Sequence, residues 1–88
     1  MGVDYDPAKA AGNLRKHKVS FADAEGVLRD PRALTVEDPD SAGEQRFVCV
    51  DDDGLGRILV VVYALHAETV RLISVRRASR GERVAYEK

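Results

Sequence analysis

Five arginines near the carboxyl end are the residues with the clearest chemical potential. They fall within thirteen positions of one another and are Arg71, Arg76, Arg77, Arg80 and Arg83. An arginine side chain is always charged, and its forked donors match phosphate oxygens two at a time. Such a group can hold an RNA backbone and stabilise the charge of a phosphoryl transition state. The alternative interpretation is an exposed surface whose arginines pair with acids of a neighbouring segment or of a partner protein.

The arginines make one positive region in a chain whose net charge is only −1. Residues 70–88 carry six basic groups against two acids, which gives +4, and the other 69 residues carry eight against thirteen, which gives −5. This balance argues against coating nucleic acid through bulk charge, but it leaves room for a local basic site. Residues 30–53 alone hold eight acids against two arginines, so carboxylates that could pair with the arginines also exist within the chain.

Three further side chains are candidates for proton transfer. Glu82 could act as a general base, although its spacing from Ser79 already explains it as part of a helix cap. Tyr86 could donate to a phosphate or carry a proton, and it could equally pin a terminal helix to a sheet. His17 belongs to a residue type that titrates near neutral pH, but in a basic last turn it can also serve the helix dipole. His17 and Tyr86 therefore stand as alternative proton carriers.

The sequence lacks the patterns of a metal or membrane protein. Two isolated histidines and one cysteine have no zinc-ligand spacing, and Asp51-Asp52-Asp53 lacks the ligand ladder of a calcium loop, so we read it as a turn. We expect no metal and no cofactor. A lone cysteine suits a reducing cytosol. The chain shows no leader, and its longest apolar run, residues 58–65, is too short for a membrane span. We therefore expect a cytoplasmic location without a membrane partner.

The elements that must position these residues begin with two helices. Asp6 before Pro7 is typical of a helix start, and Ser20 with Asp23 forms an acidic variant of a capping box for the second helix. Pro31 ends that helix, and the very short linker makes the two helices an angled pair. Apolar residues at helical spacing predict the buried stripes, which are Pro7, Ala10, Ala11 and Leu14 in the first helix and Phe21, Ala24, Val27 and Leu28 in the second.

After these helices the periodicity changes to that of strands. We expect four of them, at residues 33–36, 45–50, 57–65 and 70–75. Connections this short force an antiparallel meander, because parallel neighbours need a crossover of a dozen residues or more. Ser79 with Glu82 is a capping box that starts a short terminal helix. The expected fold class is α+β, with two N-terminal helices packed on a four-stranded antiparallel sheet and a short C-terminal helix, in a single domain over residues 1–88.

Several short motifs, in order and with their spacing kept, resemble the BrnT toxin family. These motifs are residues 5–10, 13–17, 19–21 with Ala24, 44–47, 59–62, 71–78, Glu82-Arg83 and Tyr86. Three positions depart from the family pattern. Lys18 stands where a glycine usually follows the histidine, which removes the favoured left-handed helix stop. Tyr5 replaces a frequent tryptophan, and Val75 stands where alanine is common.

The resemblance implies a RelE-like fold and a ribonuclease toxin of a type II toxin–antitoxin system, which inhibits translation and growth and is neutralised by a DNA-binding, BrnA-type antitoxin. It further implies metal-independent RNA cleavage in which the 2′-hydroxyl attacks and a 2′,3′-cyclic phosphate remains. The catalytic candidates are then Arg71, Arg76, Arg80, Arg83, His17 and Tyr86, and the RNA-binding candidates are Lys16, Arg77 and Ser74. The competing hypothesis is a degenerate, non-catalytic module that keeps its arginines for binding nucleic acid or a partner.

The position of the antitoxin follows less directly. Screening makes charges more than roughly 8 to 10 Å away count for little at cellular salt, so acids elsewhere in the chain do not shield the arginines. We therefore expect an acidic antitoxin segment over the arginines of residues 76–83. If that surface stays free, the acidic side at residues 38–53 becomes the docking face.

Overall fold

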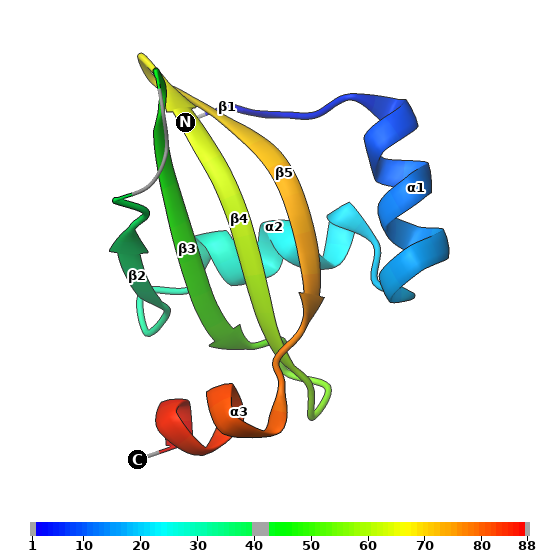
Figure 1. Cartoon of the computed structure of the whole chain (residues 1–88), viewed down its shortest axis with the longest axis vertical. Coiled ribbons are helices and arrows are strands. Elements are labelled where there is room, and N and C mark those ends of the chain that lie inside the picture. Colours follow the sequence, from blue (N-terminus) through cyan, green and yellow to red (C-terminus); the bar gives the residue numbers. More distant parts are fainter. Residues whose placement is uncertain (1, 40–42, 88) are drawn as a thin grey trace.

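The computed structural model describes residues 2–39 and 43–87, which form a five-stranded sheet and three helices (Figure 1). The elements in chain order are β1 (Gly2–Asp4), α1 (Pro7–His17), α2 (Phe21–Arg29), β2 (Leu34–Glu37), β3 (Gln45–Asp52), β4 (Ile58–His66), β5 (Thr69–Arg77) and α3 (Arg80–Glu87). The strand order is β1-β5-β4-β3-β2. None of the helices in these two ranges has the length and apolar character that a membrane crossing requires.

The α+β class is confirmed, but the expected four-stranded antiparallel sheet is wrong. β1 adds a fifth strand and lies parallel to β5, with Val3 opposite Val70, whereas all other neighbours are antiparallel. Three residues are too few to show alternation, and the partner strand lies at the other end of the chain, so no local spacing signals this pair. The four expected strands are present with ends shifted by one or two residues.

The two N-terminal helices are present, but they do not share one face of the sheet. Figure 1 shows α2 crossing the sheet and α1 standing beside β5, and α2 contacts β3, β4 and β5. Both predicted starts are confirmed, because Asp6 accepts a hydrogen bond from the amide of Ala8 at 2.9 Å and Ser20 accepts one from the amide of Asp23 at 3.3 Å. The predicted stripe of α2 is also confirmed, and the core consists of Val19, Phe21, Ala24, Val27, Cys49, Leu59, Val61, Leu72 and Val75.

The predicted stripe of α1 is largely wrong. Leu14 is 49% exposed, and Pro7 and Ala11 are exposed as well, whereas Asn13 is only 8% exposed. Ala10 alone of the four packs partly against the core. Compared with the predicted orientation, α1 is rotated so that Asn13 faces the sheet. This is because α1 lies at an edge of the sheet, where an amide side chain has backbone groups to bind.

A bulge in β5 decides which side chains share a face of the sheet. Val62 lies opposite Ser74 and Tyr63 opposite Leu72, so Ile73 has no partner in β4. An extra residue shifts the alternation by one. Arg71 and Arg76 therefore lie on the same face although they are five residues apart, and Ser74 lies between them. This face is the one opposite α2.

Candidate functional site

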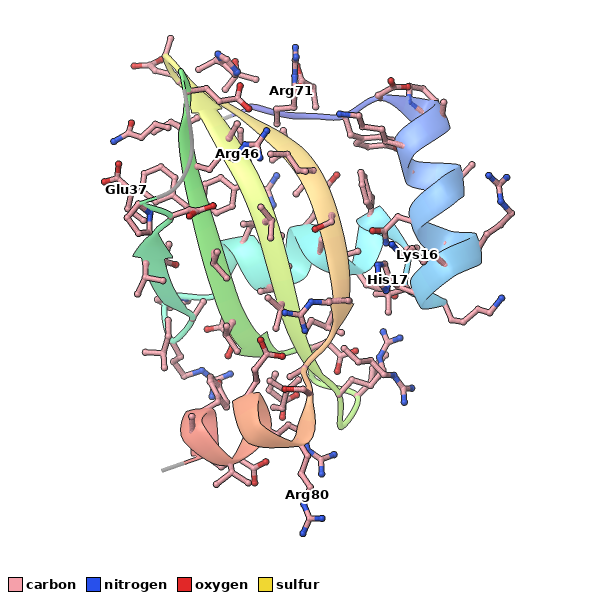
Figure 2. The ribbon with its side chains drawn as sticks, viewed as in Figure 1. Lys16, His17, Glu37, Arg46, Arg71 and Arg80 are labelled. Carbon is pink, nitrogen blue, oxygen red and sulfur yellow. The ribbon has the colours of Figure 1, made fainter. Side chains whose placement is uncertain are left out.

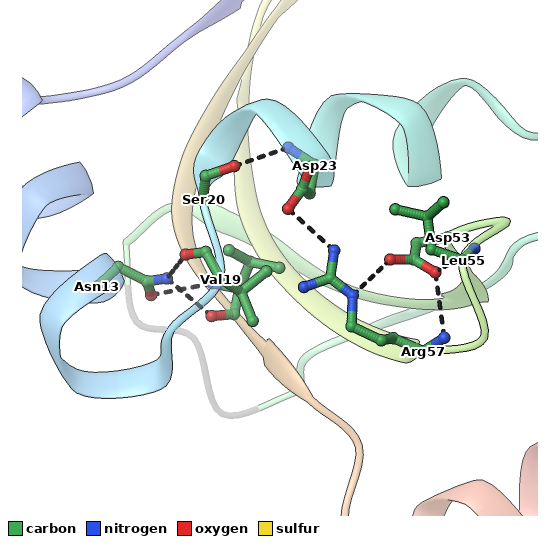
Figure 3. A network of polar contacts seen from close by, with 8 residues as sticks. Asn13, Val19, Ser20, Asp23, Asp53, Leu55 and Arg57 are labelled. Atoms are coloured by element: carbon green, nitrogen blue, oxygen red, sulfur yellow. Dashed lines mark hydrogen bonds and ion pairs between the residues drawn. The ribbon is translucent and has the colours of Figure 1, made fainter.

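The side chain of Asn13 fixes α1 to β5. Its Nδ2 donates to the carbonyl oxygen of Val75 at 2.8 Å and to that of Val19 at 3.1 Å, and its Oδ1 accepts from the amide of Val75 at 3.1 Å (Figure 3). β1 pairs with β5 only as far as Arg71, so the amide satisfies backbone groups that a longer neighbouring strand would have bound. The sequence predicted no role for Asn13, although this residue begins the BrnT-like motif of residues 13–17 and lies at helical spacing from Ala10.

This clamp sets the last turn of α1 beside the lower half of β5. Figure 2 shows Lys16 and His17 at the end of α1 that lies beside this part of the strand. Lys16 is exposed and His17 is half-buried. Among the side chains that the structure describes, the lysines and arginines without a carboxylate at ion-pair distance are Lys9, Arg15, Lys16, Lys18, Arg29, Arg77, Arg80 and Arg83. Most of these cations gather at the end of α1 and at the junction of β5 with α3.

The five arginines of the predicted cluster do not meet at one point. Arg71 lies at one end of β5 and Arg80 follows its other end (Figure 2). At a rise of about 3.3 Å per residue, Arg71 and Arg76 are separated by roughly 16 Å along the strand. They therefore lie at two separate points along β5, with Ser74 between them, and cannot contact one phosphate together.

Arg71 and Arg76 each form an ion pair with a carboxylate, and the two pairs differ in strength. Arg71 meets Asp4 at 3.4 Å, with both side chains more than half exposed, and such a surface pair contributes little and opens readily. Arg76 donates both ends of its fork to Glu82, at 2.7 and 2.9 Å. Arg76 therefore ties the start of α3 to β5, and its guanidinium must exchange Glu82 for a phosphate before it can bind RNA.

The predicted capping box of α3 is confirmed. Glu82 Oε1 accepts from the amide of Ser79 at 2.8 Å, and the amide of Glu82 donates to Ser79 Oγ at 3.2 Å. Arg76 and the Ser79 amide together lower the pKa of Glu82 to about 2. A carboxylate held ionised by these donors is poorly suited to take a proton, so the structural interpretation of Glu82 is favoured over the catalytic one.

Tyr86 reaches back from α3 to the sheet. Its hydroxyl donates to Asp51 Oδ1 at 2.6 Å, and this hydrogen bond raises the pKa of Tyr86. Asp51 is 2% exposed, and this burial raises its pKa. The neighbouring Asp30 shows the opposite shift, because hydrogen bonds with Asp51 and with Arg32 lower its pKa to about 2. The buried Oδ2 of Asp51 meets no donor in the described structure, which fits a carboxylic acid that itself donates to Asp30.

Replacing Asp51 by asparagine is expected to stabilise the fold at pH 7 to 8. The folded-state pKa of Asp51 lies above its ordinary 3.8, so folding favours the protonated form and ionisation lowers stability as the pH rises above that value. An asparagine amide can still accept from Tyr86 and donate to Asp30. Thermal unfolding should show the gain near neutrality and its loss near pH 3, whereas Asp52→Asn, at an exposed position, should change little. A destabilised Asp51→Asn at pH 7 would contradict this assignment.

The turn predicted at the triple aspartate begins later than expected, because Asp51 and Asp52 are the last residues of β3 and pair with Leu59 and Ile58. Asp52 Oδ1 accepts from the amide of Gly54 at 2.6 Å, and Asp53 Oδ1 accepts from the amide of Leu55 at 2.8 Å. Arg57 holds the turn against α2, because it binds Asp53 at 2.6 Å and Asp23 at 3.0 Å (Figure 3). Within residues 2–39 and 43–87, no three His, Cys, Asp or Glu side chains are grouped to hold a metal ion.

Lys18 ends α1 in the left-handed conformation, contrary to the expectation that its side chain removes this stop. Its φ is 60° and its amide donates to the carbonyl oxygen of Leu14. This conformation costs a non-glycine residue roughly 1–2 kcal/mol, and the greater freedom of glycine in the unfolded chain offsets roughly 0.5–1 kcal/mol. Lys18→Gly should therefore stabilise the fold by roughly 0.5–1 kcal/mol in denaturant unfolding, while Arg15→Gly inside the helix should destabilise it by about 1 kcal/mol. A loss of stability in Lys18→Gly would contradict the left-handed stop.

Comparison with known proteins decides the family. The family model described as the ribonuclease toxin BrnT of type II toxin–antitoxin systems matches residues 5–82. The chain belongs to the BrnT family. Its fold is similar to the crystal structure of the BrnT ribonuclease toxin of Brucella abortus, with a TM-score of 0.70 and 25% sequence identity over 91% of this chain and 99% of that one. A comparison with curated proteins gave no match.

The predicted BrnT resemblance is thus confirmed, together with an α+β fold like that of the Brucella protein. The matched region covers α1 to the start of α3, and so it includes the Asn13 clamp, the last turn of α1 and all of β5. The roles of individual residues stay predictions.

Proposed function

We propose that this BrnT-family chain is a metal-independent endoribonuclease toxin that binds RNA along β5. The observation that carries the proposal is the Asn13 clamp, which brings Lys16 and His17 to the half of β5 that ends in Arg77. Binding an RNA strand needs several cations along its path, and cleaving it needs a proton carrier beside them. The exposed cations at the end of α1 and after β5, with His17 beside them, support this proposal.

The cations form two groups, one that guides the RNA strand and one at the proposed site of cleavage. Arg71 and Ser74 line the upper part of the path and guide the strand, since the ion pair of Arg71 with Asp4 is exposed. Arg77, Arg80 and Arg83 lie at the lower end, where the described structure gives them no carboxylate partner. Arg76 holds α3 in place and joins the phosphate contacts when it exchanges Glu82.

The reaction is an internal phosphoryl transfer. The 2′-oxygen attacks the adjacent phosphorus as its proton passes to a base, and the bond to the 5′-oxygen breaks as that oxygen takes a proton. The products are a 2′,3′-cyclic phosphate and a 5′-hydroxyl, so no water is consumed in this step. We assign the proton transfer to His17, which lies among free cations, in preference to Tyr86, whose hydroxyl is bound to Asp51.

We also propose a biological setting, which membership of the BrnT family supports. The substrate is RNA in the bacterial cytoplasm, its cleavage inhibits translation and growth, and a BrnA-type antitoxin that binds DNA covers the toxin. Neither a metal ion nor a cofactor takes part in the proposed step. A degenerate module that binds RNA without cutting it remains the alternative outcome of the test below.

Inducing the chain alone in a bacterial host is the test of this function. We expect growth arrest and fragmented total RNA with the native chain, and relief of both with Arg77→Glu. Arg29→Glu reverses one charge at the end of α2 and serves as the matched control, for which we expect arrest to persist. Normal growth with intact RNA at confirmed expression would favour the non-catalytic module.

A further inference from the structure

β2 is an exposed edge of the sheet. It pairs with β3 on one side only and is the last strand in the sheet order of the described residues. All four of its residues are exposed, including Leu34 at 57% and Val36 at 65%. An open strand edge with apolar side chains is a template for an added strand.

The apolar side chains of β2 continue into a groove on the face opposite α2. Leu34 lies opposite Val50 and Val36 opposite Val48 in the β2–β3 register, so all four side chains share this face. Ala85, Tyr86 and Glu82 of α3 close the lower side of the groove, which has a volume of about 250 Å³. The groove is therefore shaped by the β2–β3 pair and by α3, and it follows Leu34 and Val36 along β2.

Acidic side chains lie at both ends of β2. Glu37 ends the strand and forms no ion pair in the described structure (Figure 2). Beyond Leu34, β3 continues to Asp52 without a β2 partner. There the groove meets a second cavity of about 460 Å³, lined by Arg32, Asp51, Asp52, Gly54, Gly56 and Tyr86. Tyr86 borders both cavities, so they form one continuous surface.

We propose that an extended segment of the antitoxin adds a strand to the free edge of β2, with alternate apolar side chains in the Leu34–Val36 groove and basic side chains beside Glu37 and Asp52. Alternation follows from the strand period of two. The basic residue near Asp52 falls two positions beyond the apolar residue that faces Leu34, which gives the segment a spacing of apolar, any, apolar, any, basic. This inference rests on the proposed toxin function and names the chemistry of its partner.

The charge pattern argues against a second copy of this chain as the occupant. A two-fold symmetric pair of edge strands runs antiparallel. The Glu37 end of one copy would then approach the Leu34 end of the other, where Asp52 lies. Arg32 lies at the same end, but Asp30 binds it at 3.3 Å, so the net charge there stays negative. Like charges placed opposite each other destabilise strand pairing, whereas a basic segment meets net negative charge at both ends.

The test uses the full chain and its antitoxin, identified as the protein whose co-expression relieves growth arrest, with the two purified separately and mixed. Val36→Asp and Glu37→Lys change exposed side chains of β2 and should each raise the dissociation constant by tenfold or more. Val84→Asp, on α3 outside the groove, and Glu68→Lys, in the turn before β5, are the matched controls and should stay within about twofold. Amide hydrogen exchange of residues 34–37 should slow in the complex.

The outcomes separate docking from catalysis. Free Val36→Asp should cleave RNA as fast as the native chain, because β2 has no part in the RNA path. Unchanged affinity in both β2 variants, or unprotected amides at residues 34–37 in the complex, would overturn the docking proposal. So would a dimer of the chain alone that Val36→Asp dissolves. A native chain that binds the antitoxin at β2 but leaves RNA intact would remove the proposed function and leave the docking site standing.

Discussion

Replacing Asn13 by alanine is expected to be the most destabilising alanine substitution in α1, with a loss of about 3 kcal/mol, because Asn13 is the buried residue of this helix. The substitution removes three hydrogen bonds and leaves the buried amide and carbonyl of Val75 without partners, and each such group costs roughly 1–3 kcal/mol. Small domains have total stabilities of roughly 5–15 kcal/mol, so the effect should be plain in urea unfolding.

Leu14→Ala is the matched control for this prediction. It removes a larger apolar side chain from the neighbouring position, but Leu14 is 49% exposed, and surface substitutions usually change stability by about 0.5 kcal/mol or less. A helix with Leu14 in the core would show the opposite ranking. Equal or inverted losses in the two variants would contradict the orientation of α1 and the clamp with it.

His17→Ala should lower the rate of RNA cleavage by roughly 10²–10⁴-fold, the usual contribution of a positioned acid or base. Tyr86→Phe should reduce it by less than about tenfold, because the Tyr86 hydroxyl is committed to Asp51 and its loss chiefly weakens the attachment of α3 by about 1 kcal/mol. The measurement is the single-turnover rate with saturating enzyme, so that weaker RNA binding does not enter.

The same variants decide between the two proton carriers that the sequence leaves open. A larger loss in Tyr86→Phe than in His17→Ala would move the chemistry to the cavity beside Asp51. Folded stability should be checked for both proteins at the assay temperature, since α3 is attached mainly through the Arg76–Glu82 pair and the Tyr86–Asp51 hydrogen bond.

The sequence predicted the features that depend on residues within one turn of helix of each other, namely helix caps and the apolar stripe of α2. The cap of α2 by Ser20 and the capping box of Ser79 with Glu82 follow from residues three positions apart, and the structure contains both. The apolar stripe of α2 was equally readable, since Phe21 and Ala24 face a sheet that needs apolar cover. These features depend on spacing within one turn of helix.

What the sequence did not predict depends on contacts between distant segments. β1 exists because three residues pair with the last strand, and Asn13 is buried because that pairing stops at Arg71. The bulge at Ile73 places Arg71 and Arg76 on one face of the sheet. Without the bulge, two residues five positions apart would lie on opposite faces. The sequence allows the arginines to pair with nearby acids in general, but the specific pair of Arg76 with Glu82 depends on how α3 folds back toward β5.

Cleavage of a defined RNA in the presence of EDTA tests the central claim most directly. The substrate carries a single 2′-deoxynucleotide on the 5′ side of its cleaved bond, and an all-ribose RNA of the same sequence is the control. The account predicts that the purified chain cuts the control to a 2′,3′-cyclic phosphate and a 5′-hydroxyl and leaves the substituted bond intact. Cleavage of the substituted bond, or activity that EDTA abolishes and a divalent ion restores, would contradict it.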